Sequence, residues 1–491
     1  MTKQSSSTER AESSALAKVK ARVARQRKKR RGVALIMVLG SLAVLTVLVT
    51  ELQESSSSTL SAALAERDAL KAEYHARSGA SLARMLIATE QPIRQVFTPI
   101  WAAMGQKGAP PQIPVWKFTS LVLGPFNCSE SQGDFTRITQ AKPDSGKNLG
   151  STGGCFDIRI IDEDSKINVN TAAKGDPFSQ RQVGAALLGL MSSPQYAPLF
   201  ENADADGQYS NQPTICGALV DYADADENNY ACDPLADSAN TSHGPEDNYY
   251  QSVGLPYLRK NAAFDSLDEV RLVRGMSDDF WATFVDPNSA DPDQRVLTVW
   301  GQGKTNINTA NAQTLLALTC AGAPEAPLCI DPEQMQIFLM AVTLAREVTQ
   351  GMPVFKSPKA FTRALSGKGK GIGSLFGALG LEPVTFKDPK LVERAVQTDS
   401  RVFSIYVDGI VPGRHRETRV RIHDVVDFRS ANELGQASEE TQATQQGTTT
   451  DREKEAEKNP GASSTEPPTA EELAAALASD PLGVIIYHRI E

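Results

Sequence analysis

Apolar and polar positions divide the first ninety residues into a continuous apolar run and a longer patterned stretch. Residues 33–50 carry no charge and are mostly apolar, a length close to the shortest that crosses a bilayer as a helix. No proline follows until Pro92, so the pattern predicts one helix from Val33 to about Thr89. The second half of this helix is expected to lie against a globular head. It carries an approximate apolar stripe at Leu60, Leu64, Leu70, Tyr74, Leu82 and Met85.

Beyond the helix, alternating apolar positions predict a series of strands. They are Trp116–Leu123, Phe135–Gln140, Phe156–Ile161, Val296–Trp300, Thr305–Asn308, Val402–Val407, Arg419–Val426 and Val484–Tyr487. The strands at Val402–Val407 and Arg419–Val426 are expected to form a hairpin with its turn near Gly409–Gly413. Residues 171–297 are expected to be mainly helical and rich in loops, so the chain is of the α+β class.

Later segments complete this pattern. Helices are expected from Ala310 to about Arg346 and over Pro389–Ala395, where the proline occupies the first turn. Ser430–Pro468 is rich in Glu, Gln, Thr, Ser and Pro and poor in apolar residues, which predicts a disordered linker.

Charge is distributed unevenly around the apolar run. Residues 1–32 contain 11 Lys or Arg and two Glu, near +9, whereas the remainder contains 39 basic and 57 acidic residues, near −18. By the positive-inside rule, this asymmetry places the N-terminus in the cytoplasm and the bulk of the chain in the periplasm, behind a single pass through the inner membrane. An acidic exterior argues against nucleic acid as a partner. Residues 1–32 show no apolar periodicity and are expected to be disordered.

The basic cluster ends at Gly32, immediately before the apolar run. This order is typical of a class III (prepilin) signal, in which the peptidase cuts before the apolar segment and leaves it on the mature protein. An ordinary secretory signal ends in small residues after its apolar part, and Val49–Gln53 offers no such site. We therefore expect cleavage between Gly32 and Val33 and methylation of the Val33 amine. An uncleaved membrane anchor is the alternative.

All six cysteines follow the apolar run, and their even number is typical of disulfides in an oxidising compartment. Six cysteines permit 15 pairings, between which the sequence does not decide. Nearest-neighbour pairing is the simplest, and it joins Cys128 to Cys155, Cys216 to Cys232 and Cys320 to Cys329.

Five separated blocks resemble the K-class minor pseudopilins of the type II secretion system. They occur in the order of that family and are Ile161–Asn170 (IDEDSKINVN), Leu219–Asp226 (LVDYADAD), Glu246–Tyr250 (EDNYY), Ser266–Met276 (SLDEVRLVRGM) and Thr305–Ala310 (TNINTA). In the first block, Asp164-Ser165 stands where the family more often has a residue followed by Gly. The resemblance spans roughly residues 31–310.

The resemblance implies a pilin-like head on a transmembrane helix, with a mainly helical domain inserted into the head. Its parts are expected at 1–32 (leader), 33–90 (helix, with the membrane span at 33–50), 91–170 (first part of the head), 171–297 (insert), 298–430 (helices and closing strands), 431–480 (linker) and 481–491 (C-terminal strand). The strands around Asn168–Asn170 and Asn306–Asn308 are expected to pair in one sheet. The implied partners are prepilin peptidase, the I-class and J-class pseudopilins, the inner-membrane assembly platform and membrane lipid.

The fifth mature residue indicates a position in the filament. Counting from Val33, this residue is Met37, whereas most pilin-like subunits carry Glu there. A Glu carboxylate neutralises the terminal amine of the next subunit in a low-dielectric bundle, where an unpaired charge costs several kcal/mol. The K class resembles this chain in lacking the Glu, which implies a non-enzymatic subunit that caps, and helps to nucleate, the tip.

The acidic stretch of the insert is the candidate metal site. Asp221, Asp224 and Asp226 place three carboxylates close together, with Glu246 and Asp247 following. Calcium prefers six to eight oxygen ligands, and the resemblance implies calcium in this domain. An exposed acidic loop without metal is the alternative. The EF-hand-like start at Asn202 fails, because Pro213 stands where the loop needs its last Glu.

Two other functions find partial support in the sequence. A membrane-anchored periplasmic DNA-binding protein is suggested by the hairpin-like Gly371-Ile372-Gly373 beside Lys368 and Lys370, but the acidic balance opposes it. A calcium-dependent hydrolase lacks a nucleophile–base set, since no G-x-S-x-G occurs and the five histidines are scattered. Gly301–Thr305 resembles a phosphate-binding loop, yet it leads into a strand rather than a helix.

Overall fold

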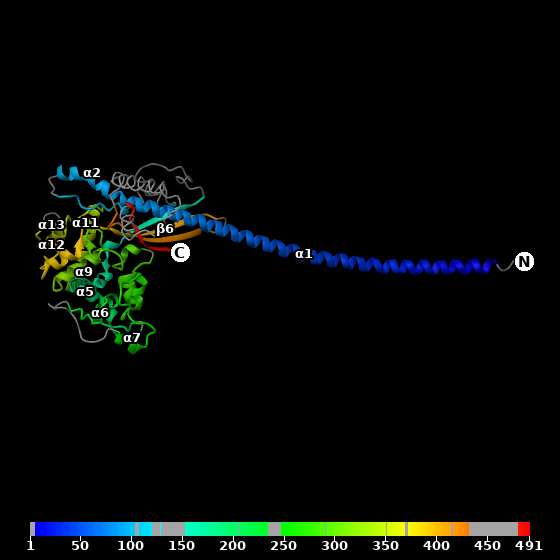
Figure 1. Ribbon diagram of the computed structural model, residues 1–491, viewed down its shortest axis with the longest axis horizontal. Coiled ribbons are helices and arrows are strands. Elements are labelled where there is room, and N and C mark those ends of the chain that lie inside the picture. The colour runs from blue at the N-terminus through cyan, green and yellow to red at the C-terminus, as the bar shows by residue number, and fades with distance from the viewer. Residues whose placement is uncertain are drawn as a thin grey trace, which may run out of the picture. The chain divides into compact units, whose positions relative to one another are not determined.

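A computed structural model shows an α+β protein with a long N-terminal helix (Figure 1). It describes residues 5–103, 108–119, 128, 153–204, 206–233, 247–289, 291–349, 351–368, 372–413, 416–431 and 480–491. Contacts divide the chain into two units, residues 1–70 and 71–491. The strands predicted at Phe135–Gln140 and in the second half of Trp116–Leu123 lie outside the described residues.

The helices follow the predicted order closely. The α-helices are α1 Ser5–Ala88, α2 Glu90–Ala103, α5 Pro177–Met191, α6 Gln212–Ala223, α7 Asn248–Val253, α8 Asp278–Phe280, α9 Ala312–Gly322, α10 Pro327–Ile330, α11 Pro332–Val348, α12 Pro358–Leu365, α13 Ile372–Ala378 and α14 Pro389–Ala395. Short 3₁₀ or π turns are η1 Val115–Phe118, η2 Glu163–Ser165, η3 Val169–Lys174, η4 Pro194–Phe200, η5 Leu267–Leu272, η6 Trp281–Val285 and η7 Pro292–Gln294.

The strands form one larger sheet and two small ones. They are β1 Cys155–Asp162, β2 Ile167–Asn168, β3 Leu297–Thr298, β4 Thr305–Asn306, β5 Val396–Gln397, β6 Val402–Val411, β7 Thr418–Asp427 and β8 Val484–Ile490. The head sheet is antiparallel with the order β1-β6-β7-β8. Because β1 and β6 are neighbours in this sheet, the mainly helical region between them in sequence is an insertion, which confirms the predicted fold class.

One face of the head sheet packs against residues 71–88 of α1 (Figure 1). The helix contributes small side chains three or four positions apart, so they lie on one face: Ala72, Ala76, Ala80 and Ala83. Gly409 in β6 permits the close crossing, because a Cβ at this position would collide with the carbonyl oxygen of Ala72. Phe156, Ile405, Val407 and Ile422 complete this core.

The insertion has its own, larger core. Helices α5 and α9 pack closely at its centre. Side chains from these and neighbouring elements are buried in this core, among them Leu187, Leu219, Phe284, Leu315 and Phe338. The three predicted disulfides are confirmed, and the two in this region join Cys216 to Cys232 and Cys320 to Cys329. In the head, Cys128 is joined to Cys155, and the backbone N–H of Cys128 donates to the Phe156 carbonyl along the edge of β1.

Several expectations for the first part of the chain are wrong. The leader was expected to be disordered, but α1 begins at Ser5, since residues 10–31 are dominated by Ala, Arg and Lys, which favour helix. Of the apolar stripe within residues 71–88, Leu82 packs against the head core but Tyr74 and Met85 are exposed, and an alanine face crosses β6 because only small side chains fit over Gly409. Residues 115–118 form a 3₁₀ turn, not a strand.

Two strand predictions also need correction. β2 pairs with β3 and β4 pairs with β5, both in parallel, so the strands at Asn168 and Asn306 do not share a sheet. The hairpin turn lies between Val411 and Thr418 rather than at Gly409–Gly413, because β6 continues through Gly409 under α1.

Candidate functional site

The predicted processing site lies inside α1. The bond between Gly32 and Val33 falls within the helix, four residues before Met37, and the Val33 and Met37 side chains are exposed. Among the described residues, one helix is long and apolar enough to cross a membrane, with a mean hydropathy of 2.6 over its best window and none of that window buried. This helix is a candidate membrane anchor.

Three buried acids at the end of β1 join the head to the insertion. The Asp162 carboxylate accepts hydrogen bonds from the hydroxyls of Thr309 and Ser400, both at 2.5 Å. Asp164 accepts from the backbone N–H of Gln302, Arg401 and Val402, at 3.1, 2.7 and 3.1 Å. These contacts tie the first family-like block to both small sheets and to the start of β6.

Burial dominates the protonation of these acids. It raises the pKa of Asp162 to about 6 and, together with the neighbouring Asp162 charge, that of Asp164 to about 7. Burial is also the largest influence on Glu163, but Lys166, at 3.4 Å, the hydrogen bonds from Ser404 and Thr298, and the Arg295 charge together hold the pKa of Glu163 below its usual range. All three side chains are committed to groups inside the protein, which indicates a structural role.

The two N-x-N segments, Asn168–Asn170 and Asn306–Asn308, make equivalent sets of hydrogen bonds. The side chains of Asn168 and Asn306 accept from the backbone N–H of Asn170 and Asn308, at 2.9 and 3.0 Å. Asn170 in turn holds Phe264, accepting from its N–H at 2.7 Å and donating to its carbonyl at 2.9 Å. Asn308 holds Phe355 by the equivalent pair, at 2.8 and 2.9 Å. The first and last family-like blocks are therefore structural anchors of the insertion.

The predicted metal residues sit at the C-terminal end of α6. Asp221 accepts from the backbone N–H of Tyr230 at 2.7 Å, and Asp224 accepts from the side chain of Gln180 at 3.0 Å. The other carboxylate oxygen of Asp224 is buried without a hydrogen-bond partner. Burial raises the pKa of Asp221 to about 8, and burial with the nearby Asp226 charge raises that of Asp224 to about 7.

The remaining predicted ligands are dispersed. Asp226 is exposed and accepts from the backbone N–H of Asn228 at 2.8 Å, while Asp247 lies 3.3 Å from the guanidinium of Arg259. Glu246 lies outside the described residues. In the part of the chain that the structure describes, no three acidic, histidine or cysteine side chains gather closely enough to hold a metal ion by themselves.

Two residues of this site were missed by the sequence analysis. The Arg259 guanidinium donates to the carbonyls of Asp221 and Asp226, at 3.3 and 2.9 Å, and so places a positive charge within the acidic turn. The amide of Asn261 lies 2.7 Å and 3.2 Å from the carbonyl oxygens of Asp224 and Asp226, and donates to both when its nitrogen faces them. No local pattern signals either contact, because both residues follow the turn by more than thirty positions.

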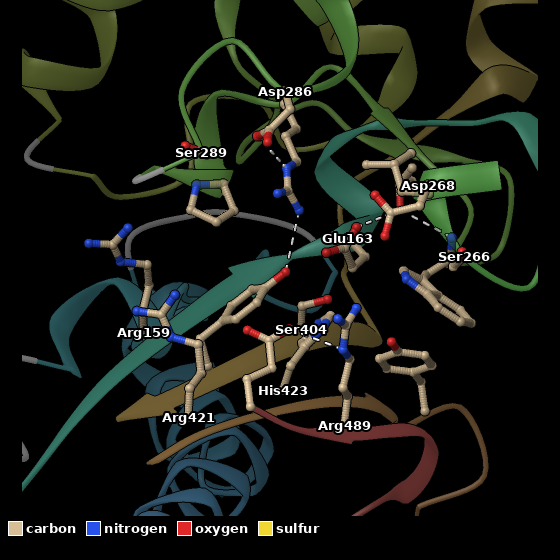
Figure 2. Close-up of a pocket in the computed structure, with 18 of the residues that line it drawn as sticks. Arg159, Glu163, Ser266, Asp268, Asp286, Ser289, Ser404, Arg421, His423 and Arg489 are labelled. Atoms are coloured by element: carbon tan, nitrogen blue, oxygen red, sulfur yellow. Dashed lines mark hydrogen bonds and ion pairs between the residues drawn. The ribbon is translucent and has the colours of Figure 1, made fainter. Parts of the chain in front are cut away.

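A cavity of about 640 Å³ was also missed (Figure 2). It separates the polar face of the head sheet from the insertion. The sheet contributes Arg159, Tyr406, Arg421, His423 and Arg489, and the insertion contributes Trp281, Asp286, Arg295 and Trp300. Most of the charges are paired: Arg295 donates to Asp286 at 3.0 Å, and Arg421 donates to Asp408 at 2.6 and 2.8 Å. The alternation of Arg419, Arg421 and His423 along β7 is the feature of the sequence that indicates a polar face on this strand.

The helix-hairpin-helix-like residues are only partly described. Gly373 lies in α13, which packs against α12, whereas Lys370 and Gly371 lie outside the described residues. The Gly301–Thr305 loop contacts Asp164 and Thr171 of the first anchor segment, which accounts for its two glycines without a phosphate.

The fold and the site define an α+β protein with one N-terminal helix suited to crossing a membrane. Residues 165–285 match the family described as type II secretion system (T2SS), protein K. No curated protein matches the sequence. A chain in the crystal structure of the GspK-GspI-GspJ complex from the type 2 secretion system of enterotoxigenic Escherichia coli is 16% identical with a TM-score of 0.39. That similarity covers 74% of this chain and 92% of that chain.

Proposed function

We propose that this protein is a minor pseudopilin at the tip of the type II secretion pseudopilus, which it helps to nucleate and cap for protein export. The observation that carries the proposal is a protein K segment at 165–285 in a chain with an apolar N-terminal helix behind a basic leader. The role is structural and non-enzymatic, because the buried acids of the first block are bound to backbone and hydroxyl groups of the same chain.

Processing and membrane placement are part of this proposal. Prepilin peptidase would cut between Gly32 and Val33 and methylate the new amine, leaving residues 33–50 in the inner membrane and the head in the periplasm. The charge difference across the apolar run supports this orientation. Intact-mass measurement of membrane-purified protein tests it: a mature chain that begins with methylated Val33 is expected, and a chain that keeps residues 1–32 would contradict it.

The tip position rests on Met37. Without a carboxylate at the fifth mature position, this subunit has no group to pair with the amine of a subunit placed beyond it. Gold labelling of isolated pseudopili should therefore mark one end of each filament. Periodic labelling along the filament would contradict a capping role.

The proposed partners are the I-class and J-class pseudopilins, the assembly platform and membrane lipid. Support comes from apolar side chains that α1 leaves uncovered, Leu60 and Leu64 in the first unit and Tyr74 and Met85 in the second. A stripe of this kind suits packing against a neighbouring helix. Cysteine cross-linking from Leu64→Cys to either partner is expected, whereas Ala76→Cys, which faces the head, serves as the matched control.

Calcium at the acidic turn is the last part of the proposal. The buried oxygen of Asp224 that has no hydrogen-bond partner, together with the Asp226 carboxylate, fits a hard cation. Asp221, Glu246 and Asp247 would complete the set. Arg259 already balances part of this charge, so the ion would add to an existing ion pair.

Thermal melting of the full chain in detergent tests the calcium site. Calcium is expected to raise the melting temperature relative to chelator, because a ligand that binds only the folded state stabilises it. Asp221→Ala with Asp224→Ala should abolish the shift, and Asp279→Ala, an exposed acid on α8, is the matched control. Equal melting of the native chain with and without calcium would leave Arg259 as the only cation of the turn.

A further inference from the structure

The outer edge of β8 is open. β8 pairs with β7 on one side, and no other described strand pairs with it. Arg421 and Glu491 exchange both of their backbone hydrogen bonds, at 2.9 and 2.8 Å. Since such pairs alternate along an antiparallel ladder, the backbone N–H and C=O of His488 and Ile490 point away from β7. A second strand can bind these groups.

The side chains of β8 protect this edge only on one face. Ile485, Ile486 and Ile490 are 41%, 45% and 43% exposed, whereas the charged residues that normally protect an edge strand, Arg489 and Glu491, border the cavity. A bulge between Val425 and Val426 leaves Ile486 without a partner residue on β7. Ile490 lies opposite Ile422, which belongs to the core between the sheet and α1. An added strand with apolar side chains on this face would extend that core.

The other face of the same strand borders the cavity. Tyr487, Arg489 and Glu491 line it from β8, and Arg421 and His423 line it from β7 (Figure 2). The Nε2 atom of His423 is buried without a hydrogen-bond partner. A strand beside β8 would direct every second side chain toward this space. The guanidinium groups that border it, those of Arg421 and Arg489, are paired with Asp408 and Glu491, so polar side chains of either charge suit this face.

The strand is also held firmly enough to act as a template. Arg84 of α1 donates to the carbonyls of Leu482 and Gly483, at 2.9 and 2.7 Å, and pairs with Asp480 at 3.2 Å. His488 pairs with Asp424 of β7 at 2.5 Å. Both ends of β8 are therefore fixed to the head without any use of its outer edge.

We propose that the open edge of β8 binds an extended strand of a partner protein. This strand has apolar side chains on the face toward α1 and polar side chains on the face toward the cavity. Main-chain hydrogen bonds to His488 and Ile490 would supply the binding, and the alternating side chains would supply the selectivity. The inference goes beyond the proposed pseudopilin role and does not depend on it, since it involves neither the protein K segment nor residues 33–50.

The test uses the full chain in detergent and a blocked nine-residue peptide of alternating valine and glutamate with a fluorescent label. Polarisation should report saturable binding, and hydrogen exchange should slow at His488 and Ile490. A peptide N-methylated on the amides of one edge cannot donate to β8 along that edge. With either edge methylated in turn, one of the two peptides should bind at least tenfold more weakly.

Variants of His488 separate the edge from the side chain. His488→Pro removes an N–H that faces the open edge and leaves the ladder to β7 intact, so peptide binding should fall at least tenfold. His488→Ala loses the same side chain but keeps the N–H, and should bind like the native chain. Absence of binding at millimolar peptide, equal binding of both methylated peptides and the parent, or equal binding by both variants would each overturn the proposal. If His488→Pro does not fold, the methylated peptides still decide.

Discussion

Asn170 and Asn308, far apart in the sequence, hold the backbones of Phe264 and Phe355 by the same two hydrogen bonds. Each amide accepts from the phenylalanine N–H and donates to its carbonyl. In this way a short loop after each small strand captures a distant segment of the insertion. The duplication explains why two nearly identical sequences, N-V-N-T-A at 168–172 and N-I-N-T-A at 306–310, occur in one chain.

Replacing Asn170 with Ala should destabilise the insertion by about 1–3 kcal/mol, because the N–H and C=O of Phe264 lose their partners while remaining partly buried. Asn308→Ala should have an effect of similar size. Urea unfolding of the full chain in detergent measures both. The matched control is Asn202→Ala, whose amide makes one exposed contact and which should change stability by less than about 0.5 kcal/mol. Equal stabilities of all three variants would contradict the anchoring role.

Gly409→Val should destabilise the head by about 2 kcal/mol or more, because its side chain would collide with the backbone of α1 at Ala72 and force the helix away from β6. Gly377→Ala in α13 is the control: no heavy atom lies near its added Cβ, and Ala favours helix more than Gly does. Thermal melting should show opposite shifts for the two variants. A neutral Gly409→Val would show that the close crossing is not maintained in solution.

Stability should fall as the pH rises from 6.5 to 8.5 in the presence of chelator. Burial raises the pKa of Asp164 and Asp224 to about 7 and that of Asp221 to about 8, above the value of about 4 in an unfolded chain. The folded state therefore keeps protons that the unfolded state has released, and this advantage is lost as the pH passes through 7–8.

The pH window avoids His423, whose pKa burial lowers to about 4 and whose effect on stability ends near pH 6.5. Asp221→Asn should flatten the decline in melting temperature, since the amide does not titrate. A melting temperature that stays constant or increases up to pH 8.5 in the native chain would be incompatible with these raised pKa values.

Excision of residues 432–479, with a short Gly-Asn turn in their place, should leave the melting temperature unchanged or higher. β7 and β8 are adjacent antiparallel strands, and a Cβ at Gly483 would lie 3.1 Å from the Phe428 ring, so the two ends of the excised segment meet. Closing a shorter connection costs less entropy. Extending the deletion through Glu491 removes β8 and should lower the melting temperature. If the shorter deletion lowers it equally, the segment contributes to the head.

Local signals were sufficient for most individual elements. The apolar run, the strand at Phe156–Ile161, α14 and the nearest-neighbour disulfides were all predicted, because periodicity, proline placement and short chain separations are properties of adjacent residues. The predicted domain boundaries and the calcium ligands remain predictions. Glu246 is outside the described residues, and the acids that are described hold separate partners.

The amino-acid sequence by itself determined that α1 is a helix from Val33 onward, that β6 and β7 form a hairpin and that residues 221–226 end in an acidic turn. Only the tertiary structure decided that α1 crosses β6 with an alanine face, because the steric limit is set by Gly409, far away in the chain. It also decided that Arg259 enters the acidic turn and that β2 pairs with β3 rather than β4. Periodicity records which face of an element is apolar, whereas the partner of that face depends on shapes and charges supplied by distant residues.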